Sequence, residues 1–380
     1  MKYRKLGRSG LTVSEICLGT MTFGGEGFWR VIGAQDQSVA DALVKNAVDK
    51  GVNFIDTANV YSNGLSEQIL GQSIKNLGLP RDELVIATKV FGRPMLAPPG
   101  QSVQGTPEQL RRFANPNTWG LSRKHILDAI DASLERLGLD YVDLYQTHAF
   151  DPITPIEETL ETFDEIVRSG RARYIGICNN AAWQLAKALG ISAAKGLARF
   201  ESAQMYYSIA GRDLEREITP LAKEEGFRSC PGGPLAGGFL SGKFTRDGGP
   251  NDARRTAFDF PPVDKEKAFD IIDVMRPMRK RAAHPSRKSR SPGCCASRKS
   301  PASSSARRTE AQLENNIAAS EVSLTADELS ALNKGVGAEA GISRLDDRAP
   351  GRRSAQGALV RTPRRRVSDR AAARSFVTAA

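Results

Sequence analysis

The chain has 380 residues, of which 40% are hydrophobic, and a formal net charge of +11. Its five cysteines show no Cys-x-x-Cys spacing, so we expect no zinc or other metal and no disulfide framework. This length suits one large α/β barrel or two smaller domains. No apolar run approaches the roughly 18 residues that span a bilayer, and the N-terminus lacks a signal-peptide core, so we expect a cytoplasmic protein with no membrane partner.

Short apolar strands alternate with helices along the chain. After a small hairpin within 3–13, the predicted elements are a strand near 16–18, a helix over 38–50, a strand ending at Asp56, a helix over 66–77, a strand ending at Lys89, a helix over 122–137, a strand ending at His148, a helix within 155–169, a strand over 173–178, a helix over 181–189, a strand around 202–204, a helix over 214–225 and a strand after Gly226. This alternation indicates parallel strands with right-handed crossovers. Seven successive strands favour a (β/α)8 TIM barrel over a doubly wound sheet, and no Gly-x-Gly-x-x-Gly follows the first strand.

Four ionisable residues lie at, or just beyond, the carboxyl ends of three predicted strands: Asp56, Tyr61, Lys89 and His148. In a barrel of parallel strands, that end is where chemistry is done. An ammonium group lowers the pKa of a nearby phenol, so Lys89 beside Tyr61 would make an effective proton donor. Asp56 would hold Lys89, and His148 would donate a hydrogen bond to a carbonyl oxygen. Each residue taken singly has an ordinary structural explanation, but the four together predict a site that protonates an oxygen while hydride reaches carbon.

The positive charge is concentrated in two stretches. Residues 279–307 contain nine Lys/Arg and no Asp/Glu, residues 336–380 have an excess of six positive charges, and the rest of the chain is therefore at −4. These stretches could be nucleic-acid arms, disordered tails or the product of an altered reading frame. Aromatic residues do not alternate with the basic ones as stacking platforms would require, so we expect no nucleic-acid partner.

Several motifs resemble the aldo-keto reductase superfamily. They are GTMTFGG at 19–25, FIDTA at 54–58 with Tyr61, GxSE at 64–67, ATK at 87–89, RSGRARYIG at 168–176 and PLAGGFLSGK at 234–243. The resemblance covers about residues 1–278 and 308–334. It implies a TIM barrel that reduces a small aldehyde or ketone to an alcohol with NADP(H).

The resemblance also implies a role for each site residue. By position, Tyr61 is the general acid, Lys89 and Asp56 tune it, and His148 orients the carbonyl. Residues from several loops would bind NADP(H): Gly19, Thr20, Met21, Asp56, Asn179, Gln204, Leu235, Gly237, Lys243, Arg308, Gln312, Asn315 and Asn316. Of these, Asn179 and Gln204 match positions that hold the nicotinamide carboxamide. The last four match the motif that binds the adenosine 2′-phosphate and adenine. Cys178 stands where many members have Ser.

Three stretches depart from the family pattern: about 228–233, 279–307 and 335–380. The family usually has an aromatic residue and Ser just before Pro-Leu-Ala-Gly, whereas this chain has Arg-Ser-Cys-Pro-Gly-Gly at 228–233. With plausible codons and a shift of two bases, residues 228–232 become Val-Leu-Pro-Trp, residues 292–295 Trp-Leu-Leu, and residues 303–307 Ile-Ile-Gly-Ala. A shift of one base over 338–348 gives a segment like the family's C-terminus. We therefore hypothesise that these stretches are out of frame through sequencing errors or gene decay, which resequencing would test.

As written, the chain is expected to form a reductase-like barrel over residues 1–334 with an aberrant basic stretch at 279–307. The eighth strand is expected to be disrupted, and residues 335–380 to be a disordered basic tail. Two other functions stay open: an NADP(H)-binding module like the channel-associated subunits of this family, or an inactive product of a decayed gene.

Overall fold

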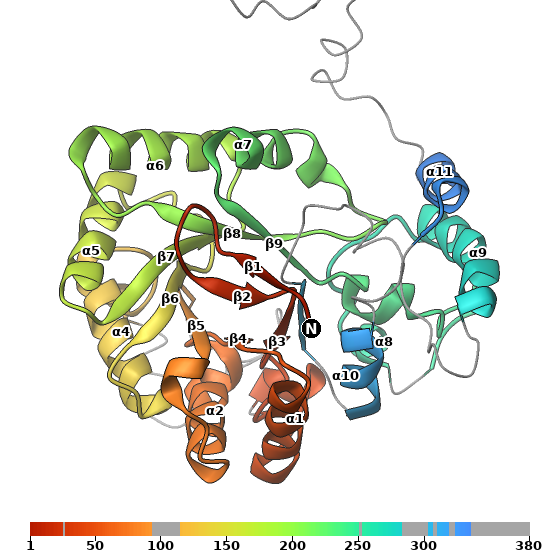
Figure 1. Ribbon diagram of the computed structural model, residues 1–380, viewed down its shortest axis with the longest axis horizontal. Coiled ribbons are helices and arrows are strands. Elements are labelled where there is room, and N and C mark those ends of the chain that lie inside the picture. The colour runs from red at the N-terminus through yellow and green to blue at the C-terminus, as the bar shows by residue number, and fades with distance from the viewer. Residues whose placement is uncertain are drawn as a thin grey trace, which may run out of the picture. The chain divides into compact units, whose positions relative to one another are not determined.

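The computed structural model describes residues 1–25, 27–92, 115–250, 253–282, 303–306, 310–318 and 324–335. All of them belong to one compact unit, Met1–Glu339. Its centre is a closed barrel of parallel strands surrounded by helices (Figure 1). The strands are, in spatial order, β10 (Ser303–Ala306), β3 (Ile16–Gly19), β4 (Phe54–Asp56), β5 (Val85–Val90), β6 (Val142–Thr147), β7 (Ala172–Cys178), β8 (Phe200–Tyr206) and β9 (Arg228–Gly232). The predicted α/β barrel is confirmed.

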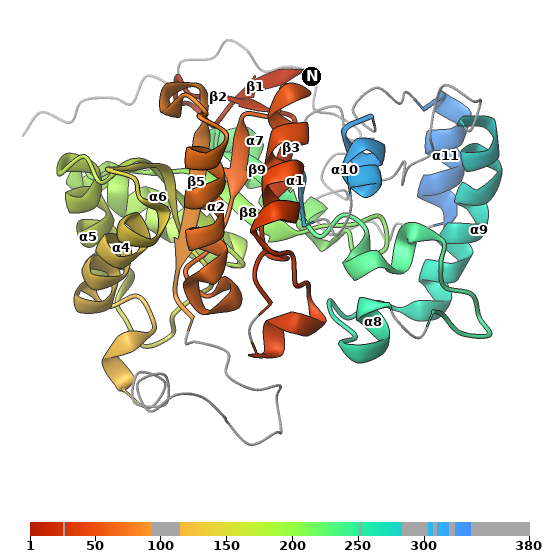
Figure 2. The ribbon, with the colours of Figure 1, turned by 90° about the horizontal axis from the view of Figure 1, so that it is seen from below.

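Helices cover the outside of the barrel (Figure 2). The helices that follow β3 to β8 are α1 (Gln37–Asp49), α2 (Leu65–Asn76), α4 (Arg123–Leu137), α5 (Ile156–Arg168), α6 (Ala182–Lys195) and α7 (Ile218–Glu225). Ser122 caps α4, because its side chain accepts a hydrogen bond from the His125 backbone N–H. Helix α6 continues six residues past its predicted end at residue 189, since Gly190 lies within it and Gly196, with φ 64°, ends it.

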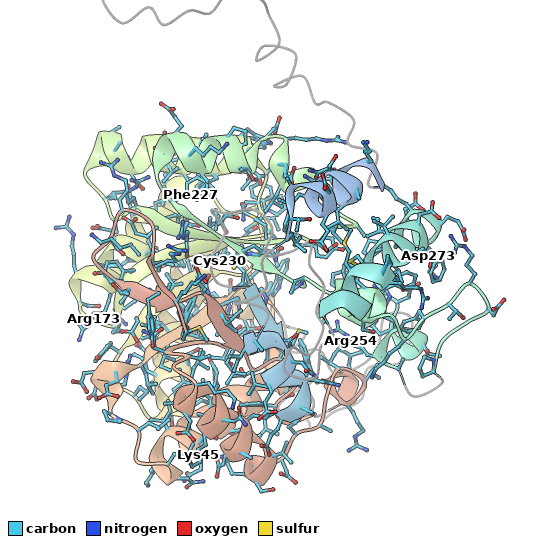
Figure 3. The ribbon with its side chains drawn as sticks, turned by 45° about the vertical axis from the view of Figure 1, so that its right-hand side comes forward. Lys45, Arg173, Phe227, Cys230, Arg254 and Asp273 are labelled. Atoms are coloured by element: carbon cyan, nitrogen blue, oxygen red, sulfur yellow. The ribbon has the colours of Figure 1, made fainter. Side chains whose placement is uncertain are left out.

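The predicted N-terminal hairpin is also confirmed: β1 (Tyr3–Lys5) and β2 (Thr12–Ser14) pair antiparallel. Leu6 and Val13 from this hairpin are fully buried and pack with residues inside the barrel, among them Phe54 and Cys230, the latter labelled in Figure 3. The hairpin therefore helps to fill one end of the barrel interior, which leaves the carboxyl ends of the strands for the functional site.

The expected disruption of the eighth strand is wrong for the backbone. Strand β10 pairs in parallel with β3 at four positions and with β9 through Ser304 and Gly232. A strand ladder uses main-chain groups, and the Ser-Ser-Ser-Ala sequence contains no proline that would remove a donor. The rest of 279–307, apart from the end of α9, and the tail 336–380 lie outside the described residues. The domain limits and the reading-frame hypothesis stay predictions.

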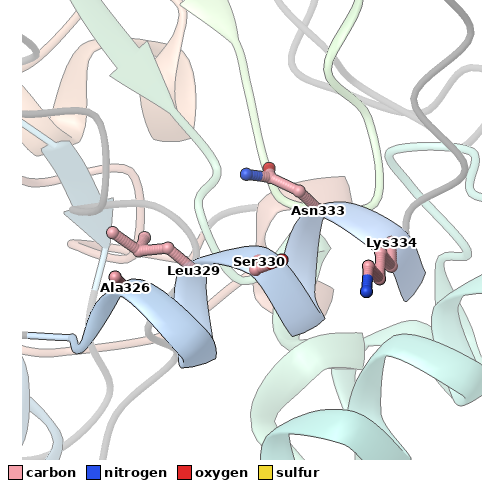
Figure 4. Close-up of a pocket in the computed structure, with 5 residues that line it drawn as sticks. All are labelled: Ala326, Leu329, Ser330, Asn333 and Lys334. Atoms are coloured by element: carbon pink, nitrogen blue, oxygen red, sulfur yellow. The ribbon is translucent and has the colours of Figure 1, made fainter.

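A second apolar cluster lies beside the barrel. It joins the 3-10 segment η6 (Ala236–Ser241), which follows β9, to α9 (Lys265–Ala282) and α11 (Ala326–Gly335) through buried residues such as Phe239, Ile272 and Leu332. A pocket beside α11 is lined by Ala326, Leu329, Ser330, Asn333 and Lys334 (Figure 4). None of the described helices is long and apolar enough to cross a membrane.

Two glycines inside helices provide a matched test of packing. A Cβ at Gly71 in α2 would lie 2.1 Å from the Leu137 carbonyl oxygen of α4, whereas a Cβ at Gly190 in α6 would meet no heavy atom within 4 Å. Gly71→Ala is therefore expected to lower the free energy of unfolding by about 1–3 kcal/mol. Gly190→Ala is expected to raise it by about 0.5–1 kcal/mol through helix propensity. Urea denaturation followed by circular dichroism measures both, and equal shifts for the two variants would contradict this packing.

Candidate active site

Asp56, Lys89 and Tyr61 form one buried hydrogen-bonded group at the carboxyl ends of β4 and β5. The Lys89 Nζ atom lies 2.6 Å from Asp56 Oδ2, 2.8 Å from the Thr57 carbonyl oxygen and 3.3 Å from the Tyr61 hydroxyl. The three protons of the ammonium group therefore each have an acceptor. Lys89 is fully buried, and Asp56 and Tyr61 are 2% and 8% exposed. The structure thus brings together three of the four residues that the sequence singled out.

His148 completes the group from the next strand. It directly follows β6, and its backbone N–H donates to the Val90 carbonyl oxygen at 2.8 Å. Its ring lies edge-on to that of Tyr61, with the ring centroids 5.5 Å apart. The Asn179 side chain donates to the His148 carbonyl oxygen at 2.9 Å, which fixes the loop that carries the imidazole. A phenol and an imidazole therefore lie side by side over a buried ion pair.

The proton on Tyr61 is held more tightly than the sequence suggested. Burial raises the pKa of the Tyr61 hydroxyl, and this outweighs the opposing effect of the Lys89 charge. The expectation of a lowered pKa is therefore wrong for the protein alone. Burial by itself would lower the pKa of Lys89, but the charge of the Asp56 carboxylate and its hydrogen bond raise it above its usual value. At neutral pH, Tyr61 is a protonated phenol beside a charged ammonium group.

His148 is neutral in this environment, because burial and the Lys89 charge lower its pKa to about 3. We expect its imidazole resonances to stay those of a neutral ring between pH 8 and 5. Since the unfolded state takes up a proton below about 6.5 and the folded state does not, stability falls as the pH falls through this range. The chain has three histidines, so NMR of labelled protein resolves the ring. Titration of His148 near pH 6.5 would contradict this assignment.

Hydroxyl groups hold the loop that carries Tyr61. Ser62 adopts φ 46°, in the left-handed region, and its side chain donates to the Phe23 carbonyl oxygen at 2.8 Å. Ser66 donates to the Thr20 carbonyl oxygen at 2.8 Å and lies 3.3 Å from the Thr57 hydroxyl. Ser66 therefore joins the loops after β3 and β4, and Gly64 occupies the N-cap position of α2. These bonds support a strained backbone next to the phenol.

An aromatic wall, made of Phe28, Trp29 and Phe258, borders Tyr61. The Trp29 ring packs edge-on against Tyr61, with centroids 5.4 Å apart, and Phe28 contacts both Trp29 and Phe258. Trp29 is 5% exposed, and within the described part of the chain its indole N–H has no hydrogen-bond partner. The sequence analysis did not single out these aromatic residues, which come from segments far apart in the chain.

Gln146 is a second residue that the sequence analysis missed. Its side-chain Nε2 donates to Asp56 Oδ1 at 3.0 Å, and it is 1% exposed. The available signal was a polar residue within the otherwise largely apolar strand that ends at His148.

Several residues predicted to bind the cofactor lie at the carboxyl ends of the strands. Gly19 pairs with Asp56, and the Thr20 N–H donates to the Asp56 carbonyl oxygen at 3.0 Å. Asn179 has φ 53°, and its N–H donates to the Gln204 carbonyl oxygen at 3.1 Å. Other predicted positions lie beyond the strands. Met21 follows β3, Leu235 directly precedes η6, Gly237 lies within η6, and Lys243 is exposed after it. Gln312, Asn315 and Asn316 lie in α10 (Glu310–Ile317). Arg308 lies outside the described residues.

The loop after β9 turns through three successive left-handed residues and is supported by an arginine. Ala236, Gly237 and Gly238 have φ values of 50°, 66° and 98°, and a Cβ on Gly237 would lie 2.4 Å from the Phe260 carbonyl oxygen. Arg255, 5% exposed, donates from Nη1 to the Ala236 carbonyl oxygen at 2.5 Å. Its Nε atom is buried without a partner among the residues that the structure covers. The Ala236 and Gly238 N–H groups donate within the turn, to the Gly233 and Leu235 carbonyl oxygens, and Arg255 pairs with Asp259. The feature of this loop that fits a pyrophosphate is therefore the Arg255 guanidinium.

The nicotinamide side of this region differs from the family pattern. Strand β9 ends at Gly232 and is followed by Gly233, and neither residue has a side chain to stack on a ring. The Tyr206 ring of β8 lies beside them, 3.3 Å from where a Cβ on Gly233 would be. No cluster of three or more His, Cys, Asp or Glu that could hold a metal occurs within the described ranges.

Comparisons with known proteins agree with this arrangement. The sequence model of the Aldo/keto reductase family matches residues 15–288. The chain is 37% identical over 248 residues to the versiconal hemiacetal acetate reductase of Aspergillus parasiticus, covering 63% of this chain and 69% of that protein. It is 39% identical over 254 residues to a putative voltage-gated potassium channel subunit beta of Schizosaccharomyces pombe, covering 66% and 67%. It is 36% identical over 278 residues to a probable subunit of the same kind from Arabidopsis thaliana, covering 73% and 76%. These matches span about two thirds to three quarters of each relative.

Proposed function

This chain belongs to the aldo/keto reductase family, and from that premise we propose that it reduces an aldehyde or ketone to an alcohol with NADPH, with Tyr61 donating the proton. The observation that carries the proposal is the position of Lys89, which bonds both the Asp56 carboxylate and the Tyr61 hydroxyl in a buried site. A relative named as a reductase supports the reaction class.

Each member of the group has a distinct role in this proposal. When bound, NADPH supplies the hydride. Tyr61 gives its proton to the carbonyl oxygen of the substrate, and the charged Lys89 stabilises the phenolate that remains. The neutral imidazole of His148 donates a hydrogen bond to the same oxygen as negative charge develops there. Asp56 keeps the ammonium group paired and in place. The aromatic wall around Trp29 favours an apolar carbonyl compound and keeps water from the phenol.

The cofactor would lie across the carboxyl ends of the strands. Asn179 and Gln204 offer amide groups to the nicotinamide carboxamide, and Arg255 beside the turn after β9 offers a positive charge to the pyrophosphate. The Tyr206 ring is the aromatic surface available beside Gly233. Selection of NADPH over NADH would depend on the segment from Arg308 through α10.

A second candidate is a module that binds NADP(H) without turning it over. Relatives named as potassium channel beta subunits, at 36–39% identity, favour it. The two candidates differ in what happens to bound cofactor, because only the enzyme passes hydride to a carbonyl.

Purified protein separates these functions. Quenching of protein fluorescence measures NADPH binding, and the fall in absorbance at 340 nm with a simple aromatic aldehyde measures turnover. Binding with aldehyde-dependent oxidation supports the reductase, and binding without oxidation supports the module. Failure to bind NADPH would contradict both and support the product of a decayed gene.

A further inference from the structure

We propose that Gln146 is a positioning residue, which fixes the Asp56 carboxylate so that Lys89 keeps its hydrogen bond to Tyr61. This inference rests on the function proposed above for Tyr61. Gln146 belongs to no motif used to identify the family, and it touches neither the phenol nor the imidazole through any bond described above.

The two oxygens of Asp56 are held by donors from two different strands. Gln146 in β6 donates from Nε2 to Oδ1 at 3.0 Å, and Lys89 in β5 donates to Oδ2 at 2.6 Å. Gln146 and Lys89 are paired directly across the strands. Because Gln146 is 1% exposed and Asp56 is 2% exposed, water does not easily replace either donor. The amide therefore fixes the orientation of the carboxylate.

Strand β7 is shaped to receive this amide. Gly176 pairs with Gln146 across β6 and β7, and a Cβ on Gly176 would lie 3.0 Å from Gln146 Cγ and 3.3 Å from Oε1. It would also lie 2.4 Å from the Ser202 hydroxyl. From the end of the same strand, the Cys178 thiol donates to Gln146 Oε1 at 3.8 Å. The side chain is thus held at both ends in a space that a larger residue at 176 would fill.

Removing the amide would change how Lys89 is shared. Asp56 Oδ1 would be left buried without its donor, a costly state that the carboxylate can relieve by turning both oxygens towards the ammonium group. Lys89 has three protons, and its contact with the Tyr61 hydroxyl, at 3.3 Å, is the longest of its three bonds. That contact is therefore the first to be lost, and with it the stabilisation of the phenolate.

Two substitutions at this position separate positioning from packing. Gln146→Leu keeps the volume and removes the donor. Gln146→Glu keeps the shape and donates only while the new carboxyl is protonated. Thr147→Val is the matched control, since Thr147 is 1% exposed on the same strand and its hydroxyl has no partner among the described residues. Three ionisable groups face this position: Asp56 from β4, Lys89 from β5 and Cys178 from β7. Tyr61 and His148 lie beyond Lys89, and Cys17 and Cys230 lie beside Asp56.

The decisive readouts are kcat and stability as functions of pH. Gln146→Leu is expected to lower kcat by about 10–100-fold at pH 7 with the NADPH dissociation constant within about twofold of wild type. Burial and the Asp56 charge raise the pKa of the new carboxyl in Gln146→Glu. Its folded-state pKa then exceeds the unfolded value of about 4.3, so the folded state holds the extra proton and stability falls as the pH rises between the two values. The kcat of this variant should fall over the same interval, while Thr147→Val matches wild type.

A kcat within twofold of wild type for Gln146→Leu would overturn the proposal. So would a Gln146→Glu variant whose kcat and urea midpoint both follow the wild-type dependence on pH. The urea midpoints are measured on protein without cofactor. If wild type shows no turnover, the function proposed for Tyr61 fails, and the stability profile of Gln146→Glu still decides whether the amide holds Asp56.

Discussion

Tyr61→Phe is expected to lower the turnover of NADPH with an aromatic aldehyde by about 10²–10⁴-fold, the usual contribution of a positioned general acid. The substitution removes one hydroxyl and leaves the ring between Trp29 and His148. Because the Lys89 and Asp56 pair stays intact, NADPH binding should change by less than about twofold. Steady-state kinetics and fluorescence titration measure the two quantities separately.

Tyr145→Phe is the matched control for this experiment. Tyr145 is fully buried, packs on Phe163, and its hydroxyl has no partner among the described residues. Its loss should leave turnover within about twofold of wild type. If Tyr61→Phe retained turnover to the same extent as Tyr145→Phe, another group would have to supply the proton and the role assigned to Tyr61 would be wrong.

Lys89→Met is expected to lower the free energy of unfolding by about 3–5 kcal/mol and to abolish turnover, because it leaves the Asp56 carboxylate buried without its cation. The double variant Lys89→Met with Asp56→Asn removes both charges, so it should regain most of the stability and none of the turnover. Urea denaturation and steady-state kinetics of the two single variants and the double variant measure this coupling.

An exposed salt bridge provides a reference for the loss of stability expected at the buried ion pair. Lys195 bonds Glu161 at 2.6 Å, but the two side chains are 46% and 53% exposed. Lys195→Met should therefore change stability by less than about 1 kcal/mol. Additive losses in the Lys89 and Asp56 cycle, or a loss for Lys89→Met no larger than that for Lys195→Met, would contradict the buried ion pair as the organising feature of the site.

The barrel could be predicted because strand–helix alternation is a local property of the sequence. Apolar runs that end in ionisable residues likewise placed Asp56, Lys89 and His148 at one end of it. Strand β10 could not be predicted, because its Ser-Ser-Ser-Ala sequence has no apolar signal and its pairing depends on the neighbouring strands already in place. Sequence patterns depend on side chains, whereas the hydrogen bonds between β10 and its neighbouring strands are made by the backbone.

The remaining differences arise from contacts between distant segments. The net pKa shift of Tyr61 depends on how completely other elements bury it, which spacing along the chain does not reveal. Gln146 bonds Asp56 although the two residues are 90 positions apart in the sequence. Arg255 donates to the Ala236 carbonyl oxygen from 19 positions away in the sequence. A residue's type indicated its chemistry in each case, and its partner was set by the fold.

Isotopic labelling of the transferred hydride tests most directly whether this chain reduces a carbonyl group. Purified protein is incubated with an aromatic aldehyde and NADPH that carries deuterium at the transferable position of the nicotinamide ring, and the products are examined by mass spectrometry and NMR. The proposed reaction gives an alcohol with one deuterium on the former carbonyl carbon, formed by wild type and about 10²–10⁴-fold more slowly by Tyr61→Phe. NADPH that binds while no labelled alcohol forms would contradict the assignment of this chain as a carbonyl reductase.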